Sequence, residues 1–146
     1  MKKLIFLGLF ILSICTTSNA QTDEQRATAK TAVEQWTNYY GLTARQRVKA
    51  EDVQLLRLSN IAEVEAAAVT GQMSEELRLR KMVSINEGAI GSMARSFDEK
   101  QMALYSSKRQ ALRKALNDEE TSLRKSKTSA AMIQIRQLQL KQAFVW

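Results

Sequence analysis

The chain of 146 residues contains no histidine, no proline, five glycines and a single cysteine, Cys15. The lack of histidine and the scarcity of cysteine exclude a catalytic dyad built on either residue and argue against ordinary zinc or copper sites. No glycine-rich phosphate loop occurs. Carboxylates do pair in sequence, as at Glu75-Glu76, but neighbouring positions on a helix diverge by about 100°. The sequence therefore predicts no enzyme and no cofactor or metal site.

The first twenty residues, MKKLIFLGLFILSICTTSNA, are typical of a secretory signal peptide. Two lysines precede an apolar run over 4–14, which is shorter than the roughly 20 residues of a membrane span. The ending at 18–20 has the small-x-small pattern of a cleavage site. We expect cleavage after Ala20, location in the periplasm or outside the cell, and one helical domain over 21–146. Cleavage would also remove Cys15, so no disulfide is expected.

Alanine, leucine, glutamate, glutamine, lysine and arginine fill the rest of the chain, and proline is absent. This composition predicts an all-α fold. Apolar periodicity and helix-end signals place helices at about 23–40, 44–70, 75–95 and 99–117, with Gly41 and Gly71 as left-handed ends. The tail over 118–146 is expected to be a helical extension, although a strand or a segment that orders on binding is left open.

Helical spacing also predicts the buried faces. In the first helix these are Ala29, Val33, Trp36 and Tyr40, and in the third Leu79, Met82, Val83, Ile90 and Met93. Asn86 falls in the middle of the third helix's face, where a buried amide would fix the register of packing.

The second predicted helix has two apolar stripes. One consists of Val48, Leu55, Ala62 and Val69, and the other of Val53, Leu56, Val64 and Ala67. Two apolar faces need two partners, so a homodimer, a groove for another protein, and burial within the same chain are the alternatives.

Positive charge gathers in the last third of the chain. Residues 100–146 carry 10 basic and 3 acidic side chains, against 10 basic and 12 acidic over 21–99. Export argues against nucleic acid as the partner. Acidic unfolded proteins, anionic lipid headgroups and lipopolysaccharide are the remaining candidates, and a solvated helix face is the alternative. Arg109 lies within the apolar stripe of the fourth predicted helix. It is either an edge residue whose charged end reaches solvent or part of a surface that binds apolar and acidic segments.

A helix-start pattern occurs twice, 55 residues apart. Leu42, Thr43 and Gln46 form the first copy, and Phe97, Asp98 and Gln101 form the second. In each, the capping side chain can accept from the backbone amide three residues on, while the glutamine reaches back to the amide of the capping residue. This is a capping box, and we expect these six residues to be structural.

Leu-Thr-x-x-Gln opening a long helix, with a second and degenerate copy at a later helix, resembles the LTXXQ family of periplasmic stress proteins, the Spy and CpxP type. The resemblance covers about 40–117 and leaves the tail outside. It implies about four helices in antiparallel hairpins, forming a thin, curved homodimer that holds unfolded proteins without ATP. Some members instead regulate an envelope-stress sensor. One branch binds zinc, which the missing histidines disfavour here.

These observations predict an ATP-independent envelope chaperone (a holdase) whose partners are unfolded or misfolded proteins. Apolar and flexible side chains together with basic ones suit weak, promiscuous binding. The candidate client-binding residues are Leu56, Met82, Met93, Met102, Arg109 and Arg113. The alternatives are a regulatory or scaffold module for a membrane sensor protein, and a protein that contacts the membrane surface or lipopolysaccharide.

Overall fold

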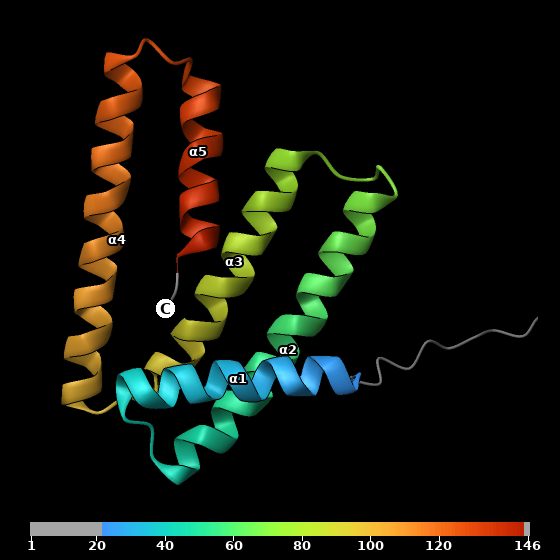
Figure 1. Ribbon diagram of the computed structural model, residues 1–146, viewed down its shortest axis with the longest axis vertical. Coiled ribbons are helices and arrows are strands. Elements are labelled where there is room, and N and C mark those ends of the chain that lie inside the picture. The colour runs from blue at the N-terminus through green and yellow to red at the C-terminus, as the bar shows by residue number, and fades with distance from the viewer. Residues whose placement is uncertain (1–21, 145–146) are drawn as a thin grey trace, which may run out of the picture.

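Five helices make up residues 22–144, the part of the chain that the computed structural model describes (Figure 1). They are α1 (Asp23–Tyr40), α2 (Ala44–Val69), α3 (Glu75–Ala94), α4 (Glu99–Lys125) and α5 (Ala130–Ala143). No strand occurs in this range, so the all-α prediction is confirmed. The expected number of about four helices is wrong. The tail over 118–146 first continues α4 as far as Lys125 and then forms a separate helix, α5, so the fourth helix is longer than the predicted 99–117. The predicted signal peptide, 1–20, lies outside the described residues.

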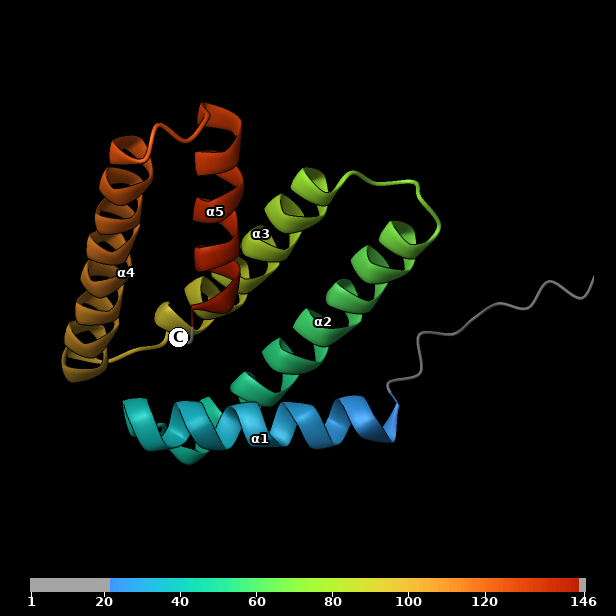
Figure 2. The ribbon, with the colours of Figure 1, turned by 45° about the horizontal axis from the view of Figure 1, so that its top comes forward.

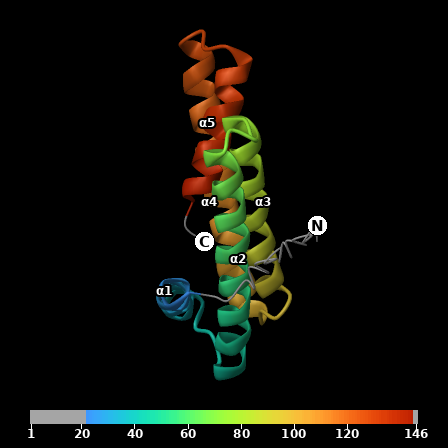
Figure 3. The same cartoon turned by 90° about the vertical axis from the view of Figure 1, so that its right-hand side faces the viewer.

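The helices α2 to α5 lie in one layer. They are spread side by side in Figure 1 and overlap one another in the edge view of Figure 3. Helix α1 lies across one face of this layer, against the first part of α2 (Figure 2). Because the layer is one helix thick, most helices keep a face that no other helix covers.

The main core lies where α1, α2, α3 and the start of α4 meet. It comprises Val33, Trp36, Tyr40, Leu42, Ala50, Ala89, Ile90 and Met93. The buried residues of α1 are the four that helical spacing predicts, and the predicted face of α3 is buried as well, with Asn86 in its middle. Periodicity therefore identified the core-facing sides of both helices.

Two glycines permit the turns that separate the first three helices. Gly41 has φ 67° and Gly71 has φ 73°, both in the left-handed region. The amide of Gly41 donates to the Thr37 carbonyl at 2.8 Å and so ends α1. These φ values confirm the predicted left-handed conformations, in which a side chain with a β-carbon would be strained.

The two apolar stripes predicted on α2 are only partly buried. Val48 and Val69, at the ends of the heptad stripe, are 66% and 87% exposed. In the other stripe Val64 is buried, whereas Leu56 is 63% exposed. Burial within the same chain therefore does not account for the heptad stripe, whose ends face solvent.

Helix α5 is attached to α3 by hydrogen bonds as well as by apolar contact. Gln134 Nε2 donates to Glu76 Oε1 at 2.8 Å, and Asn86 Nδ2 donates to the Gln142 carbonyl at 3.5 Å. The one apolar side chain of α5 that is buried is Ile133. No helix within 22–144 is long and apolar enough to span a bilayer.

Met93 tests the assignment of the core. It is fully buried, and its truncation in Met93→Ala should lower the free energy of unfolding by about 2–5 kcal/mol, because apolar contacts are lost and a cavity remains. Met132 is half exposed on α5, so Met132→Ala should change stability by less than about 0.5 kcal/mol. Urea unfolding followed by circular dichroism measures both. Equal effects of the two substitutions would contradict the assigned core.

Candidate functional site

Both predicted capping boxes are formed. At the start of α2, the Gln46 amide donates to Thr43 Oγ1 at 3.3 Å, and the Thr43 amide donates to Gln46 Oε1 at 2.9 Å. At the start of α4, the Gln101 amide donates to Asp98 Oδ1 at 2.8 Å, and the Asp98 amide donates to Gln101 Oε1 at 3.0 Å. Each box satisfies two backbone amides that have no partner within their own helix.

The glutamines of the two boxes also pair with each other. Gln46 Nε2 donates to Gln101 Oε1 at 2.8 Å, and Gln101 Nε2 donates to Gln46 Oε1 at 3.0 Å. Each Nε2 then donates to a carbonyl two residues before the opposite cap: Gln46 to Ser96 at 2.6 Å, and Gln101 to Gly41 at 3.3 Å. The arrangement is reciprocal, so the two copies of the motif form one hydrogen-bonded unit, which we call the linked caps.

The linked caps require an amide rather than a carboxylate. Each glutamine uses its oxygen as an acceptor for two N–H groups and its nitrogen as a donor to two oxygens. Gln101 is 3% exposed, so the missing donor of a glutamate could not be replaced by water. A capping box alone accepts Glu as readily as Gln. The pairing of the two boxes therefore explains the glutamine at both positions.

The apolar residue before each cap packs into the main core. Leu42 is buried, and Phe97 is half-buried, with its ring 4.8 Å from Tyr40 and 6.3 Å from Tyr105 between centroids. The Tyr40 hydroxyl is buried without a hydrogen-bond partner among the described residues, and burial raises its pKa. All six motif residues thus serve the fold, and none presents a reactive group.

The candidate client-binding residues fall into two groups. Met82 and Met93 are 6% and 0% exposed, so the prediction that they face a partner is not supported by their positions. Their helical spacing placed them on the face of α3 that the core covers. Leu56 on α2 and Met102 on α4 are 63% and 38% exposed and can contact another protein.

The two candidate arginines lie on the exposed side of α4. The Arg109 guanidinium lies 5.8 Å from the centre of the Tyr105 ring, a cation–π distance. Neither Arg109 nor Arg113 has a carboxylate within ion-pair distance among residues 22–144. By contrast, Lys114 is paired with Asp118 at 2.6 Å. Both arginines therefore lack a carboxylate partner in the part of the chain that the structure describes.

A polar cluster between α2 and α3 was missed from the sequence. Arg57 donates to Gln54 and to Asn86, and both amides are buried. Asn86 was identified through its place in an apolar stripe. The signal for Arg57 was its spacing from Ala50 and Gln54, which puts it on the side of α2 that α3 covers.

No group of three or more potential metal-ligating side chains is found within 22–144. No protein-family model, curated protein or solved structure matches the chain. What the chain binds must therefore be inferred from its surfaces.

The third capping box, Thr22 with Gln25, gives a matched control for the linked caps, since its bonds are confined to α1. Gln25→Glu should leave the free energy of unfolding within about 0.5 kcal/mol of wild type. Gln101→Glu should lower it by about 2–4 kcal/mol, because a buried carboxylate oxygen replaces the donor to the Gly41 carbonyl.

A double-mutant cycle tests the pairing itself. Gln46→Ala and Gln101→Ala should show a coupling energy of about 1–2 kcal/mol, whereas Gln25→Ala combined with either should be additive. Additivity of Gln46→Ala and Gln101→Ala in urea unfolding would show that the two boxes act independently.

Proposed function

We propose that the protein is an ATP-independent holdase of the cell envelope that binds unfolded or misfolded proteins. The observation that carries the proposal is the set of large apolar side chains that a single chain leaves exposed. They are Tyr39, Val48, Leu56, Val69, Leu77, Met102, Leu104 and Met132. Single exposed apolar residues are common, but three of these lie on one helix, α2.

An exposed apolar side chain and two cationic ones share one side of α4. Met102 is 38% exposed, and Arg109 and Arg113 follow it at spacings of seven and eleven residues, which places all three on the same side of the helix. Neither arginine has a carboxylate partner in the described chain. Such a surface offers apolar contact and attraction to acidic groups but little geometric selectivity. It suits weak binding to many unfolded chains.

The resemblance to the LTXXQ family supports the same function, and the linked caps give a physical reason for a paired Leu-Thr-x-x-Gln motif. We further propose that two copies assemble into a thin, curved dimer of antiparallel hairpins. The exposed heptad stripe on α2, which includes Val48 and Val69, is the surface that a second copy would cover. The signal-like sequence before Gln21 supports export to the envelope.

The mature protein, beginning at Gln21, should slow the aggregation of a chemically denatured acidic substrate, measured by light scattering. Arg109→Gln combined with Arg113→Gln should raise the half-effective concentration about threefold, because two unpaired cations are lost. Arg26→Gln with Lys30→Gln removes equal charge from exposed positions on α1 and should have little effect. Salt near 1 M, where the screening length is about 3 Å, should remove the difference between the variants.

Absence of any suppression at several-fold molar excess of the protein would overturn the holdase proposal. Recovery of one stoichiometric partner from envelope extract would point instead to a regulatory or scaffold module. Retention of the protein on anionic vesicles with no effect on aggregation would favour the membrane-surface alternative.

A further inference from the structure

Arg57 is a half-buried cation without a carboxylate partner in the described chain. Its Nε donates to Asn86 Oδ1 at 2.8 Å, and its Nη1 donates to Gln54 Oε1 at 3.3 Å. Both acceptors are neutral amides, 8% and 2% exposed respectively. Desolvation by burial lowers the pKa of the guanidinium, although arginine stays charged in proteins. A positive charge held in this way lacks the opposite charge that usually accompanies burial.

The guanidinium also has spare hydrogen-bonding capacity. Of its five N–H groups, two donate to the amides of Gln54 and Asn86, which leaves three with no acceptor among residues 22–144. Nη2 is the nitrogen that donates to neither amide. The fork of an arginine matches the two oxygens of a carboxylate, so the side chain is held ready for an anion of that shape.

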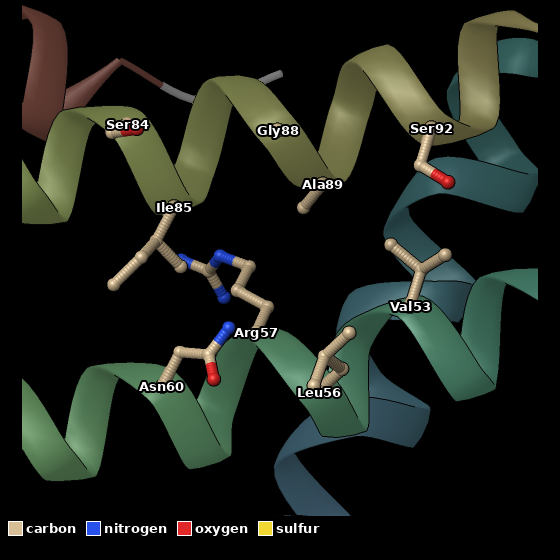
Figure 4. A pocket seen from close by; sticks show the side chains of 9 residues that line it. All are labelled: Val53, Leu56, Arg57, Asn60, Ser84, Ile85, Gly88, Ala89 and Ser92. Carbon is tan, nitrogen blue, oxygen red and sulfur yellow. The ribbon is translucent and has the colours of Figure 1, made fainter.

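A groove of about 360 Å³ between α2 and α3 leads to this side chain (Figure 4). Its lining consists of Val53, Leu56, Arg57, Asn60, Ser84, Ile85, Gly88, Ala89 and Ser92. The α3 wall is made mostly of small residues, and a β-carbon added at Gly88 would meet no atom within 4 Å. The groove is therefore open where a longer side chain from α3 would otherwise fill it.

The charges and apolar atoms of the groove specify its occupant. None of the lining residues carries a carboxylate, and Lys49 Nζ, which donates to the Ser92 carbonyl at 2.8 Å, adds a second cation at one end. Leu56 and Val53 supply apolar surface beside Arg57, and Leu56 is largely exposed. An anion flanked by apolar groups fits both features, whereas a free phosphate would leave the apolar surface uncovered.

We propose that this groove binds an aspartate or glutamate side chain of an unfolded polypeptide, with the carboxylate on Arg57 and the neighbouring apolar residues of the client on Leu56 and Val53. The site rests on the proposed holdase function and gives it a client chemistry: acidic residues interspersed with apolar ones. It differs from the α4 surface, because here the carboxylate enters a groove and makes directed hydrogen bonds.

Two fluorescein-labelled, unstructured peptides test the site: one with leucine and glutamate separated by serine spacers, and one with glutamine in place of each glutamate. Anisotropy titration should show the glutamate peptide binding wild type about tenfold more tightly than the glutamine peptide, as a charge-assisted bond predicts. Arg57→Gln should abolish this preference. Arg47→Gln, which removes an exposed charge from another side of α2, should preserve it.

A second readout uses the wild-type protein alone. The ¹H–¹⁵N signal of Arg57 Nε, assigned by through-bond correlation to the backbone of Arg57, should shift when the glutamate peptide is added and should not shift with the glutamine peptide. The absence of that shift, or equal affinity for the two peptides, would overturn the proposal. The same would follow if inorganic phosphate moved the signal and the glutamate peptide did not.

The outcomes for this site and for the holdase function are separable. If the protein binds the glutamate peptide selectively but does not slow aggregation, the proposed carboxylate site is supported and the proposed holdase function is overturned. Suppression of aggregation with no preference between the peptides would overturn the groove alone.

Discussion

The structure depends on the pairing of two glutamine side chains, Gln46 and Gln101. Each caps the helix on which it lies and donates to the backbone just before the other helix, so the starts of α2 and α4 are fixed together. The apolar residues before the caps, Leu42 and Phe97, pack into the main core at the same place. The stability of each helix start is thus coupled to the packing of the other, because breaking either cap also removes hydrogen bonds from its partner.

Arranging four helices in one layer limits how much apolar surface the chain can bury. Only Gln101 and Leu112 are buried on the 27 residues of α4, and only Ile133 on α5. Between α2 and α3, beyond the main core, the buried contacts include the amides of Gln54 and Asn86 with Arg57. Apolar side chains that a thicker fold would cover stay on the surface, where they are available to another chain.

Local chemistry made much of the fold predictable from the sequence. The capping boxes, the left-handed glycines and the core-facing stripes of α1 and α3 depend on neighbours within a few residues, and all were identified. Three other features depend on contacts between distant segments, and the sequence did not predict them. The pairing of Gln46 with Gln101 spans 55 residues. Val48 is exposed because its side of α2 faces neither α1 nor α3. The role of Arg57 depends on the contact between α2 and α3. Met82 and Met93 were assigned to a binding surface for the same reason: helical spacing alone does not distinguish a methionine that faces the core from one that faces a partner.

The linked caps and the Arg57 groove are connected through α2 and α3. The caps attach the start of α2 to the turn that follows α3, through the bond from Gln46 to the Ser96 carbonyl. The bond from Lys49 to the Ser92 carbonyl continues this attachment to the near end of the groove. Arg57 and Asn86 then join the two helices again at the groove itself. A site held at both of these points is formed before any ligand arrives, so binding need not order the protein first. The motif residues make no contact with a client in this scheme; they fix the spacing of the helices that do.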